Sequence, residues 1–442
     1  MYSKIEEDIK KREEMMMQNT NGVKEIIKNG SLDQTFLDLY FDYEGLEKQR
    51  NRYVKAIEKF EHLYGAKEIE IYSAPGRTEI GGNHTDHQNG KVLAGSIDLD
   101  AIAVVAKTEA TQVKITSEGY PALSIDISTL EPVEEEIGKT HALIRGVAAG
   151  MKKRGYNIGG FEAYVTSDVL SGSGLSSSAA YEVLIGNILS GLYNSGEVDP
   201  VTIAQIGQEA EREYFGKPCG LMDQMACSYG GMIYIDFENS KSPLVKKVDV
   251  DFNKFGYCLC IIDTKGSHAD LTDEYAAVPS EMNAVAEYFG KTHLREVNEE
   301  EFYLNISNIR TTAGDRAVLR AFHWFNENRR VEKQVESLEA GDFDAFKKYI
   351  RESGESSFKY LQNVFATKAV NSQSVSLALA LGEKFVEDFG VVRVHGGGFA
   401  GTIQAFVKEE NVKEFKNHME AFFGVDSCYV LHIRPVGGKK IV

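Results

Sequence analysis

The strongest restriction on the fold comes from Val169–Val183, VLSGSGLSSSAAYEV, in which a Gly/Ser loop leads directly into an apolar helix. Its glycines, and the serines that open the helix, are Gly172, Gly174, Ser176, Ser177 and Ser178. The glycines let the backbone approach a ligand closely, and the free N–H groups and dipole of a helix N-terminus favour an anion. Hydroxyl groups here can also reach a phosphate-bound Mg²⁺. A plain N-cap after a flexible turn is the alternative interpretation.

A second segment, Ala74–Gly90, gathers polar side chains among four glycines in APGRTEIGGNHTDHQNG. Those side chains are Arg77, Asn83, His84, Asp86, His87 and Gln88. We expect a loop here between strands at Glu68–Ser73 and Val92–Ala106. Ordering such a polar loop is costly unless it binds a polar ligand, and a sugar suits it because hydroxyls both donate and accept. The alternatives are a metal site made from His84, Asp86 and His87, and a solvated turn.

A third segment, Ala210–Gly231, carries two carboxylates that stand out from their surroundings. Glu211 lies near the end of a predicted helix, and Asp223 follows a Gly-Pro-Cys-Gly turn among apolar neighbours. A carboxylate in such a setting is either paired in the core or poised for proton transfer. A nearby cation such as Arg77 would keep Asp223 ionised.

A fourth segment, Val391–Val407, reads VVRVHGGGFAGTIQAFV and satisfies G-x-G-x-x-G formally. The residues after these glycines are β-branched and aromatic, so they predict a strand, whereas a dinucleotide-binding fold requires a helix there. We therefore expect a glycine turn that joins two strands and lets the backbone approach a ligand.

The order of elements predicts an α+β protein of two domains. At 442 residues the chain is long for one hydrophobic core. Predicted helices and strands alternate without the regular rhythm of a doubly wound sheet. We place the first domain at residues 1–245, with a helical N-terminal extension over residues 1–70, and the second at residues 246–442.

Charge and cysteine content restrict partners and compartment. The formal net charge of −17 argues against binding to nucleic acid or to an anionic membrane. No apolar stretch approaches the ~20 residues that span a bilayer, and the N-terminus lacks a secretory pattern. Five scattered cysteines, with Cys258 and Cys260 on one face of a predicted strand, indicate core roles and a reducing, cytoplasmic compartment.

Together these four segments resemble the GHMP kinase superfamily, and within it the galactokinases. The motifs that carry the resemblance are GRxxxGxHTD, GSGLSSSAA, CGLMDQ and GGGFAG, and their order and spacing match from Tyr72 to the C-terminus. The resemblance implies a two-domain α+β GHMP kinase fold with the active site in the cleft between the domains. It also implies transfer of the γ-phosphate of ATP to the 1-hydroxyl of galactose, with ATP, Mg²⁺ and a small sugar as ligands.

The resemblance further implies roles for individual residues. Asp223 corresponds to the catalytic aspartate and Arg77 to the arginine beside it. Ser178 and Glu211 correspond to Mg²⁺ ligands. The residues of the implied nucleotide-phosphate loop are Gly172, Gly174, Ser176, Ser177 and Ser178. The implied sugar contacts are Asn83, His84, Asp86, Gly220, Tyr275, Gly397 and Gly398.

Three departures from the galactokinase pattern leave the sugar open. Asn83 stands where galactokinases usually have a Glu that faces the sugar 6-position, Asp86-His87-Gln88 replaces DYN, and no arginine follows Tyr275 in 276–279. The first two resemble galacturonate kinases, since a neutral Asn can donate to a C6 carboxylate. No added Lys or Arg near the motif would pair with that carboxylate. Galacturonate or N-acetylgalactosamine kinases are therefore alternatives. A non-catalytic sugar sensor is another, although Ser177, Ser178 and Ala179 are all present.

Overall fold

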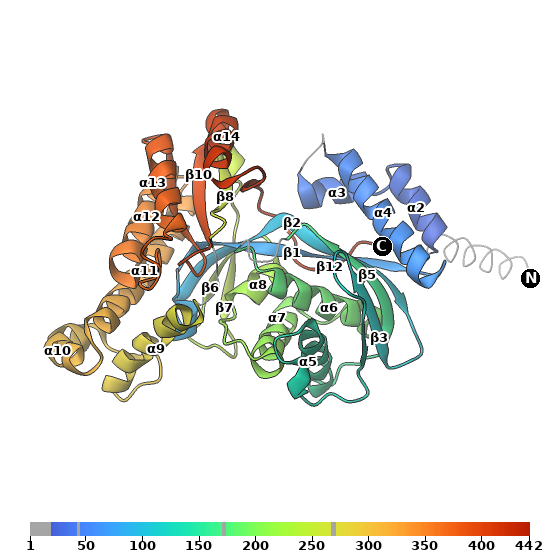
Figure 1. Cartoon of the computed structure of the whole chain (residues 1–442), viewed down its shortest axis with the longest axis horizontal. Coiled ribbons are helices and arrows are strands. Elements are labelled where there is room, and N and C mark those ends of the chain that lie inside the picture. The colour runs from blue at the N-terminus through green and yellow to red at the C-terminus, as the bar shows by residue number, and fades with distance from the viewer. Residues whose placement is uncertain (1–18, 42–44, 170–173, 267–270) are drawn as a thin grey trace, which may run out of the picture.

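The computed structural model describes residues 19–41, 45–169, 174–266 and 271–442, so the predicted loop residue Gly172 lies outside the described residues. Their strands form two sheets (Figure 1). The larger has the order β12-β1-β2-β5-β3-β4, with β6 paired to β2 and β7 to β6. Its strands are β1 (Glu70–Gly81), β2 (Lys91–Lys107), β3 (Gln112–Ser117), β4 (Leu123–Asp126), β5 (Phe161–Ser167), β6 (Met232–Asp236), β7 (Leu244–Val248) and β12 (Lys439–Lys440).

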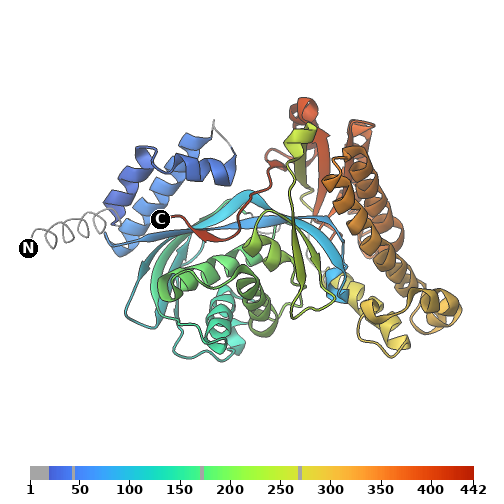
Figure 2. The ribbon, with the colours of Figure 1, turned by 180° about the vertical axis from the view of Figure 1, so that it is seen from behind.

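Helices cover both faces of the larger sheet (Figures 1 and 2). Alternate residues of β2 point to opposite faces: Ala101 and Ala103 pack in the core that contains α5, α6 and α7, whereas Ile102 and Val104 pack with the N-terminal helices. The helices of this part are α2 (Thr20–Lys28), α3 (Asp33–Tyr40), α4 (Leu46–Tyr64), α5 (Thr140–Lys153), α6 (Ser177–Asn194), α7 (Pro200–Glu209) and α8 (Met222–Tyr229). The predicted helical extension is confirmed over its described residues.

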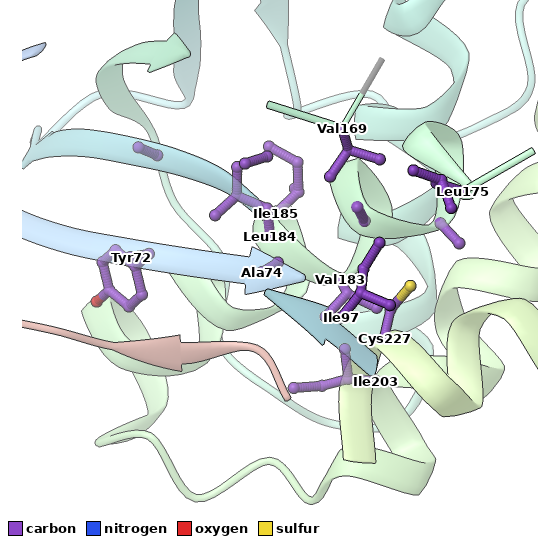
Figure 3. Packing of buried hydrophobic residues seen from close by; sticks show 14 of the residues in the cluster. Tyr72, Ala74, Ile97, Val169, Leu175, Val183, Leu184, Ile185, Ile203 and Cys227 are labelled. Carbon is purple, nitrogen blue, oxygen red and sulfur yellow. The ribbon is translucent and has the colours of Figure 1, made fainter. Parts of the chain in front are cut away.

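The core beneath the sheet anchors the predicted phosphate loop. Val169 and Leu175, which flank the loop, are both buried in the cluster formed by β1 and α6 (Figure 3). Ala74 of β1 and Val183 of α6 lie in the same cluster. Both ends of the loop are therefore fixed by apolar contacts.

The second sheet has the antiparallel order β11-β8-β10-β9. Its strands are β8 (Tyr257–Asp263), β9 (Gly390–His395), β10 (Thr402–Lys408) and β11 (Cys428–Leu431). The associated helices are α9 (Thr272–Tyr288), α10 (Glu299–Thr312), α11 (Asp315–Glu339), α12 (Phe343–Ser356), α13 (Ser374–Val386) and α14 (Val412–Phe423). The predicted glycine turn between two strands is confirmed, since β9 and β10 pair across residues 396–401. Cys258 and Cys260 are buried in β8, as expected for core residues.

Some sequence predictions differ from the structure. The stretch from Pro75 to Gly81, predicted as loop, continues β1, because it pairs with β2 through register shifts after Pro75 and after Glu79. Strands β3, β4, β7 and β12 and helices α8 and α10 were not predicted. The domain boundary predicted at residue 245 falls within β7, which pairs with β6 in the larger sheet. We therefore propose a boundary after Val248, with the chain returning to the larger sheet at β12.

Within the described ranges, no helix combines the length and the apolar character needed to cross a bilayer.

Candidate active site

A partly buried ion pair between β1 and α8 forms the centre of the candidate site. Arg77 Nε donates to Asp223 Oδ1 at 2.8 Å, and Arg77 Nη2 donates to Asp223 Oδ2 at 2.9 Å. Ser176 Oγ also donates to Oδ2. Burial would raise the pKa of Asp223, but the Arg77 charge and these hydrogen bonds lower it below its ordinary value. The predicted pairing is confirmed, and Asp223 is ionised while 32% of its side chain stays exposed.

The β-bulge in β1 and the loop before α6 hold Arg77 in place. The register of β1 against β2 shifts between Pro75 and Arg77, and such a bulge redirects a side chain. Arg77 Nη1 donates to the Gly174 carbonyl at 2.6 Å, and the Arg77 amide donates to the Leu175 carbonyl at 3.1 Å. Gly174 has φ +72°, and a Cβ there would lie 2.5 Å from Thr402 Oγ1 of β10. Position 174 therefore lies between the two sheets and requires glycine.

The two predicted metal ligands are in contact at the first turn of α6. Ser178 Oγ donates to Glu211 Oε1 at 3.0 Å. Lys217 Nζ donates to the same oxygen at 2.8 Å, and Gln224 Nε2 donates to Glu211 Oε2 at 2.9 Å and to Glu182 Oε2 at 3.0 Å. Burial, and then the Glu211 charge, raise the pKa of Glu182 well above its ordinary value. Across the part of the chain that is described, no three His, Cys, Asp or Glu residues form a metal-binding group.

The β9–β10 turn meets the predicted sugar-binding loop. His84 Nε2 donates to the Gly397 carbonyl at 3.1 Å, and the Tyr275 hydroxyl donates to the Gly398 carbonyl at 2.9 Å. A Cβ at Gly397 would lie 2.7 Å from the Tyr275 ring. Burial lowers the pKa of His84 to about 4, so the imidazole is neutral and its Nδ1 is left as an acceptor. These four predicted residues are therefore brought together.

Asp86 and Gly220 also lie side by side. A Cβ at Gly220 would come within 1.6 Å of Asp86 Oδ2, so no side chain fits at that position. Burial, and then the charge of Asp223, raise the pKa of Asp86 to about 6. The charge of Asp223 therefore acts on the Asp86 carboxylate.

Asn83 lies in a buried hydrogen-bond network behind the loop. Its Nδ2 donates to the Gly396 carbonyl at 2.6 Å and to both carboxylate oxygens of Glu79 at 3.1 and 3.2 Å. Its Oδ1 accepts from Ser357 Oγ at 3.2 Å and from Asn363 Nδ2 at 2.9 Å. A contact from the Asn83 side chain to the sugar stays a prediction, and it requires one of these bonds to break.

Helix α11 supports the same loop through residues that the sequence did not single out. His323 Nε2 donates to the Asn83 carbonyl at 2.8 Å, and Trp324 Nε1 donates to the Thr85 carbonyl at 3.2 Å. Glu327 Oε1 accepts from the Gly82 amide at 3.1 Å. The spacing of 323, 324 and 327 places these polar side chains on one helix face. This spacing was the signal available in the sequence for these residues, because polar side chains repeated along a buried helix face need hydrogen-bond partners.

Comparison with known proteins gives two family matches and a curated relative. The family described as "GHMP kinases N terminal domain" matches residues 142–231, and "Galactokinase galactose-binding signature" matches residues 58–107. The galactokinase of Lactococcus lactis subsp. lactis (strain IL1403) is 28% identical over 372 residues, 81% of this chain and 88% of that protein.

Solved structures show the same relationship. The crystal structure of Lactococcus lactis galactokinase complexed with galactose aligns with a TM-score of 0.75 at 25% identity, over 86% of this chain and 98% of that one. Mevalonate kinase from Methanococcus jannaschii aligns with a TM-score of 0.57 at 16% identity, over 82% and 98% of the two chains, and shares the fold. The fold and the paired active-site segments define a GHMP kinase. Within that superfamily the chain is similar to the galactokinases, since the galactose-binding signature, the curated relative and the structure with the TM-score of 0.75 all fall in that group.

Proposed function

We propose that this protein transfers the γ-phosphoryl group of ATP to the 1-hydroxyl of galactose, giving galactose 1-phosphate and ADP. The observation that carries the proposal is the two-point Arg77–Asp223 pair, placed between the loop that precedes α6 and the segment containing His84 and Asp86. Phosphoryl transfer requires mainly positioning and charge stabilisation, which such an arrangement supplies.

Asp223 and Arg77 carry the chemistry in this proposal. The ionised Asp223 carboxylate orients the sugar 1-hydroxyl and accepts its proton as the hydroxyl oxygen bonds to the γ-phosphorus. The bond from that phosphorus to the β,γ-bridging oxygen breaks, and the electron pair leaves with ADP. Arg77 holds Asp223 ionised and stabilises the charge that develops on the transferred group.

The sugar lies against the loop of residues 83–88 and the β9–β10 turn. His84 Nδ1 and the Asp86 carboxylate are acceptors for ring hydroxyls, and the Gly220 backbone leaves room beside Asp86. On the opposite side, Tyr275 and the turn at Gly397 and Gly398 close the sugar position. Asn83 supports this wall from behind, and its place near the 6-position stays a prediction.

The nucleotide phosphates lie at the first turn of α6 and the residues before it, where Gly174, Ser176 and Ser177 supply backbone amides and hydroxyls. The role of Gly172 in the same loop stays a prediction. Ser178 and Glu211 would hold Mg²⁺. The donor set fits a hard cation because it offers a hydroxyl and a carboxylate oxygen, and the Lys217 ammonium already lies against that carboxylate as a stand-in cation. When bound, the metal neutralises charge on the β- and γ-phosphates.

Cellular context is part of the proposal. We place the protein in the cytoplasm, where ATP and free thiols are available, and its described cysteines are all unpaired. Its partners are the sugar and ATP, and its acidic charge is unsuited to nucleic acid or anionic membranes.

A coupled ADP-release assay on a sugar panel tests the proposal. Galactose, galacturonate and N-acetylgalactosamine are each offered with Mg-ATP, and phosphorus NMR identifies the product as a 1-phosphate. We expect galactose to give the highest kcat/KM. Efficient use of galacturonate with little use of galactose would replace the substrate assignment, and binding of galactose without turnover would indicate a sensor.

A further inference from the structure

Lys217 places a side-chain cation directly on the proposed metal ligand. Its Nζ lies 2.8 Å from Glu211 Oε1, the same oxygen that accepts from Ser178 Oγ at 3.0 Å. The Glu211 side chain is only 3% exposed, whereas the Lys217 side chain is 57% exposed. The ammonium therefore reaches the buried carboxylate from the solvent side.

The backbone brings Lys217 back to Glu211. The chain forms a π-helical turn over Ala210–Phe215 and then reverses at Gly216, which has φ +86°. The amides of Gly216 and Lys217 both donate to the Glu211 carbonyl, the latter at 3.0 Å. This reversal fixes the Cα of Lys217 beside Glu211, so the ion pair follows from the local fold rather than from a long flexible reach.

The contacts of the Glu211 carboxylate leave one of its oxygens, Oε1, to a cation. The other carboxylate oxygen of Glu211 is taken by Gln224, which also donates to Glu182. The charge of Asp223 also acts on Lys217, although Arg77 balances Asp223 directly. Lys217 is consequently the cation that balances Glu211 among the described contacts of that carboxylate.

We infer that Lys217 is a built-in substitute for the metal: its ammonium occupies the cation position at Ser178 and Glu211 in the metal-free protein, and Mg²⁺ binds by displacing it. This inference rests on the proposed function, because it takes Glu211 as the metal ligand. Its consequence is that Lys217 keeps Glu211 oriented before the metal arrives, and weakens metal binding until the nucleotide phosphates contribute ligands. A lysine suits this role since its ammonium is a compact point charge on a flexible stem.

The test measures metal binding directly on the full chain without nucleotide. Titration with Mn²⁺ alone, followed by the loss of its free EPR signal, gives the dissociation constant for wild type, Lys217→Met and Lys217→Arg. Lys246→Met is the matched control, because Lys246 pairs with Glu339 at 2.6 Å and is 53% exposed, away from the site. We expect Lys217→Met to bind Mn²⁺ about fivefold more tightly, the upper range for a partly exposed ion pair, and Lys217→Arg and Lys246→Met to stay within about twofold of wild type.

Glu211→Gln, made alone and with Lys217→Met, separates failure of the inference from failure of the metal assignment. We expect Glu211→Gln to abolish the tighter binding of Lys217→Met. Unchanged or weaker Mn²⁺ binding in Lys217→Met, with Glu211 still required, would overturn the role of Lys217 alone. Mn²⁺ binding that survives Glu211→Gln would overturn both, because the metal would then lie elsewhere.

Discussion

The replacement Asn83→Glu tests how charge is balanced behind the sugar-binding loop. Asn83 Nδ2 lies 3.1 and 3.2 Å from the Glu79 carboxylate oxygens, and both side chains are buried. Arg393 donates to Glu79 at 2.6 Å and is itself fully buried, so the network holds one carboxylate and one guanidinium. Burial already raises the pKa of Glu79, although Arg393 opposes the rise. A second carboxylate at residue 83 would face the first without a cation of its own.

The expected loss in the free energy of unfolding follows from this geometry. Two unit charges about 4 Å apart repel by about 4 kcal/mol at an effective dielectric constant near 20. Protonating one carboxyl is the alternative, and at pH 7 it costs about 3.7 kcal/mol for a group whose ordinary pKa is about 4.3. We therefore expect Asn83→Glu to lower the free energy of unfolding by about 4 kcal/mol at pH 7 and by only about 1 kcal/mol at pH 5. The loss shrinks on acidification because the raised pKa keeps one carboxyl protonated.

Urea denaturation at the two pH values is the assay, with Asn83→Gln as the control of equal size and no charge. Asn83→Gln should lose stability equally at both pH values. The double variant Glu79→Gln with Asn83→Glu should recover most of the loss at pH 7, since it restores one carboxylate beside one amide. A pH-independent loss in Asn83→Glu, or a double variant no more stable than the single one, would refute this account of the network.

Three further outcomes concern catalysis. Asp223→Asn should lower kcat by ~10²–10⁴-fold with ATP affinity nearly unchanged, because it removes the carboxylate at constant size; turnover within about threefold of wild type would make Asp223 structural. Ser178→Ala and Glu211→Gln should each raise the Mg²⁺ concentration needed for half-maximal rate more than the KM for galactose, since each removes an oxygen ligand; a selective loss of sugar affinity would contradict this. The KM for galactose should rise as pH falls through about 6, because Asp86 then gains a proton and stops accepting a hydrogen bond from a sugar hydroxyl. Asp223 remains ionised over this range. In Asp86→Asn the KM for galactose should have no such pH dependence.

Local sequence patterns were sufficient to predict the segments whose contacts are with residues close by in the sequence. The serines opening α6, the Asp199–Pro200 start of α7 and the glycine turn between β9 and β10 all depend on neighbouring residues. The Arg77–Asp223 pair joins positions 146 residues apart, and there the family resemblance, rather than spacing, supplied the prediction.

Other features depend on partners that no local pattern specifies. The stretch from Pro75 to Gly81 is polar and glycine-rich, yet it is strand because β2 offers hydrogen bonds along its length. Asn83 was predicted to face the sugar from its place in a motif. Its burial depends on Glu79, Gly396, Ser357 and Asn363, three of which lie more than 270 residues further along the chain. Lys217 is an ordinary surface lysine in sequence and becomes informative only through its contact with Glu211.

Under the proposed function, the β9–β10 turn sets how far the sugar lies from the transferred phosphate. Within eight residues, His395 Nε2 contacts Thr78 Oγ1 at 3.1 Å, the Gly397 carbonyl accepts from His84 at 3.1 Å, and Thr402 packs against the loop residue Gly174. One hairpin of the second sheet thus contacts three segments of the first domain: strand β1, the predicted sugar-binding loop and the predicted phosphate loop. Because in-line transfer tolerates little error in the distance between acceptor and phosphorus, a single turn that contacts all three segments is a direct way to set it. Two glycines of this turn are needed for close approach, since a Cβ would lie 2.7 Å from the Tyr275 ring at Gly397 and 2.0 Å from the Asn363 carbonyl oxygen at Gly398. Packing within a turn, and not a nucleotide-binding helix, is therefore what requires the Gly398 of the G-x-G-x-x-G pattern.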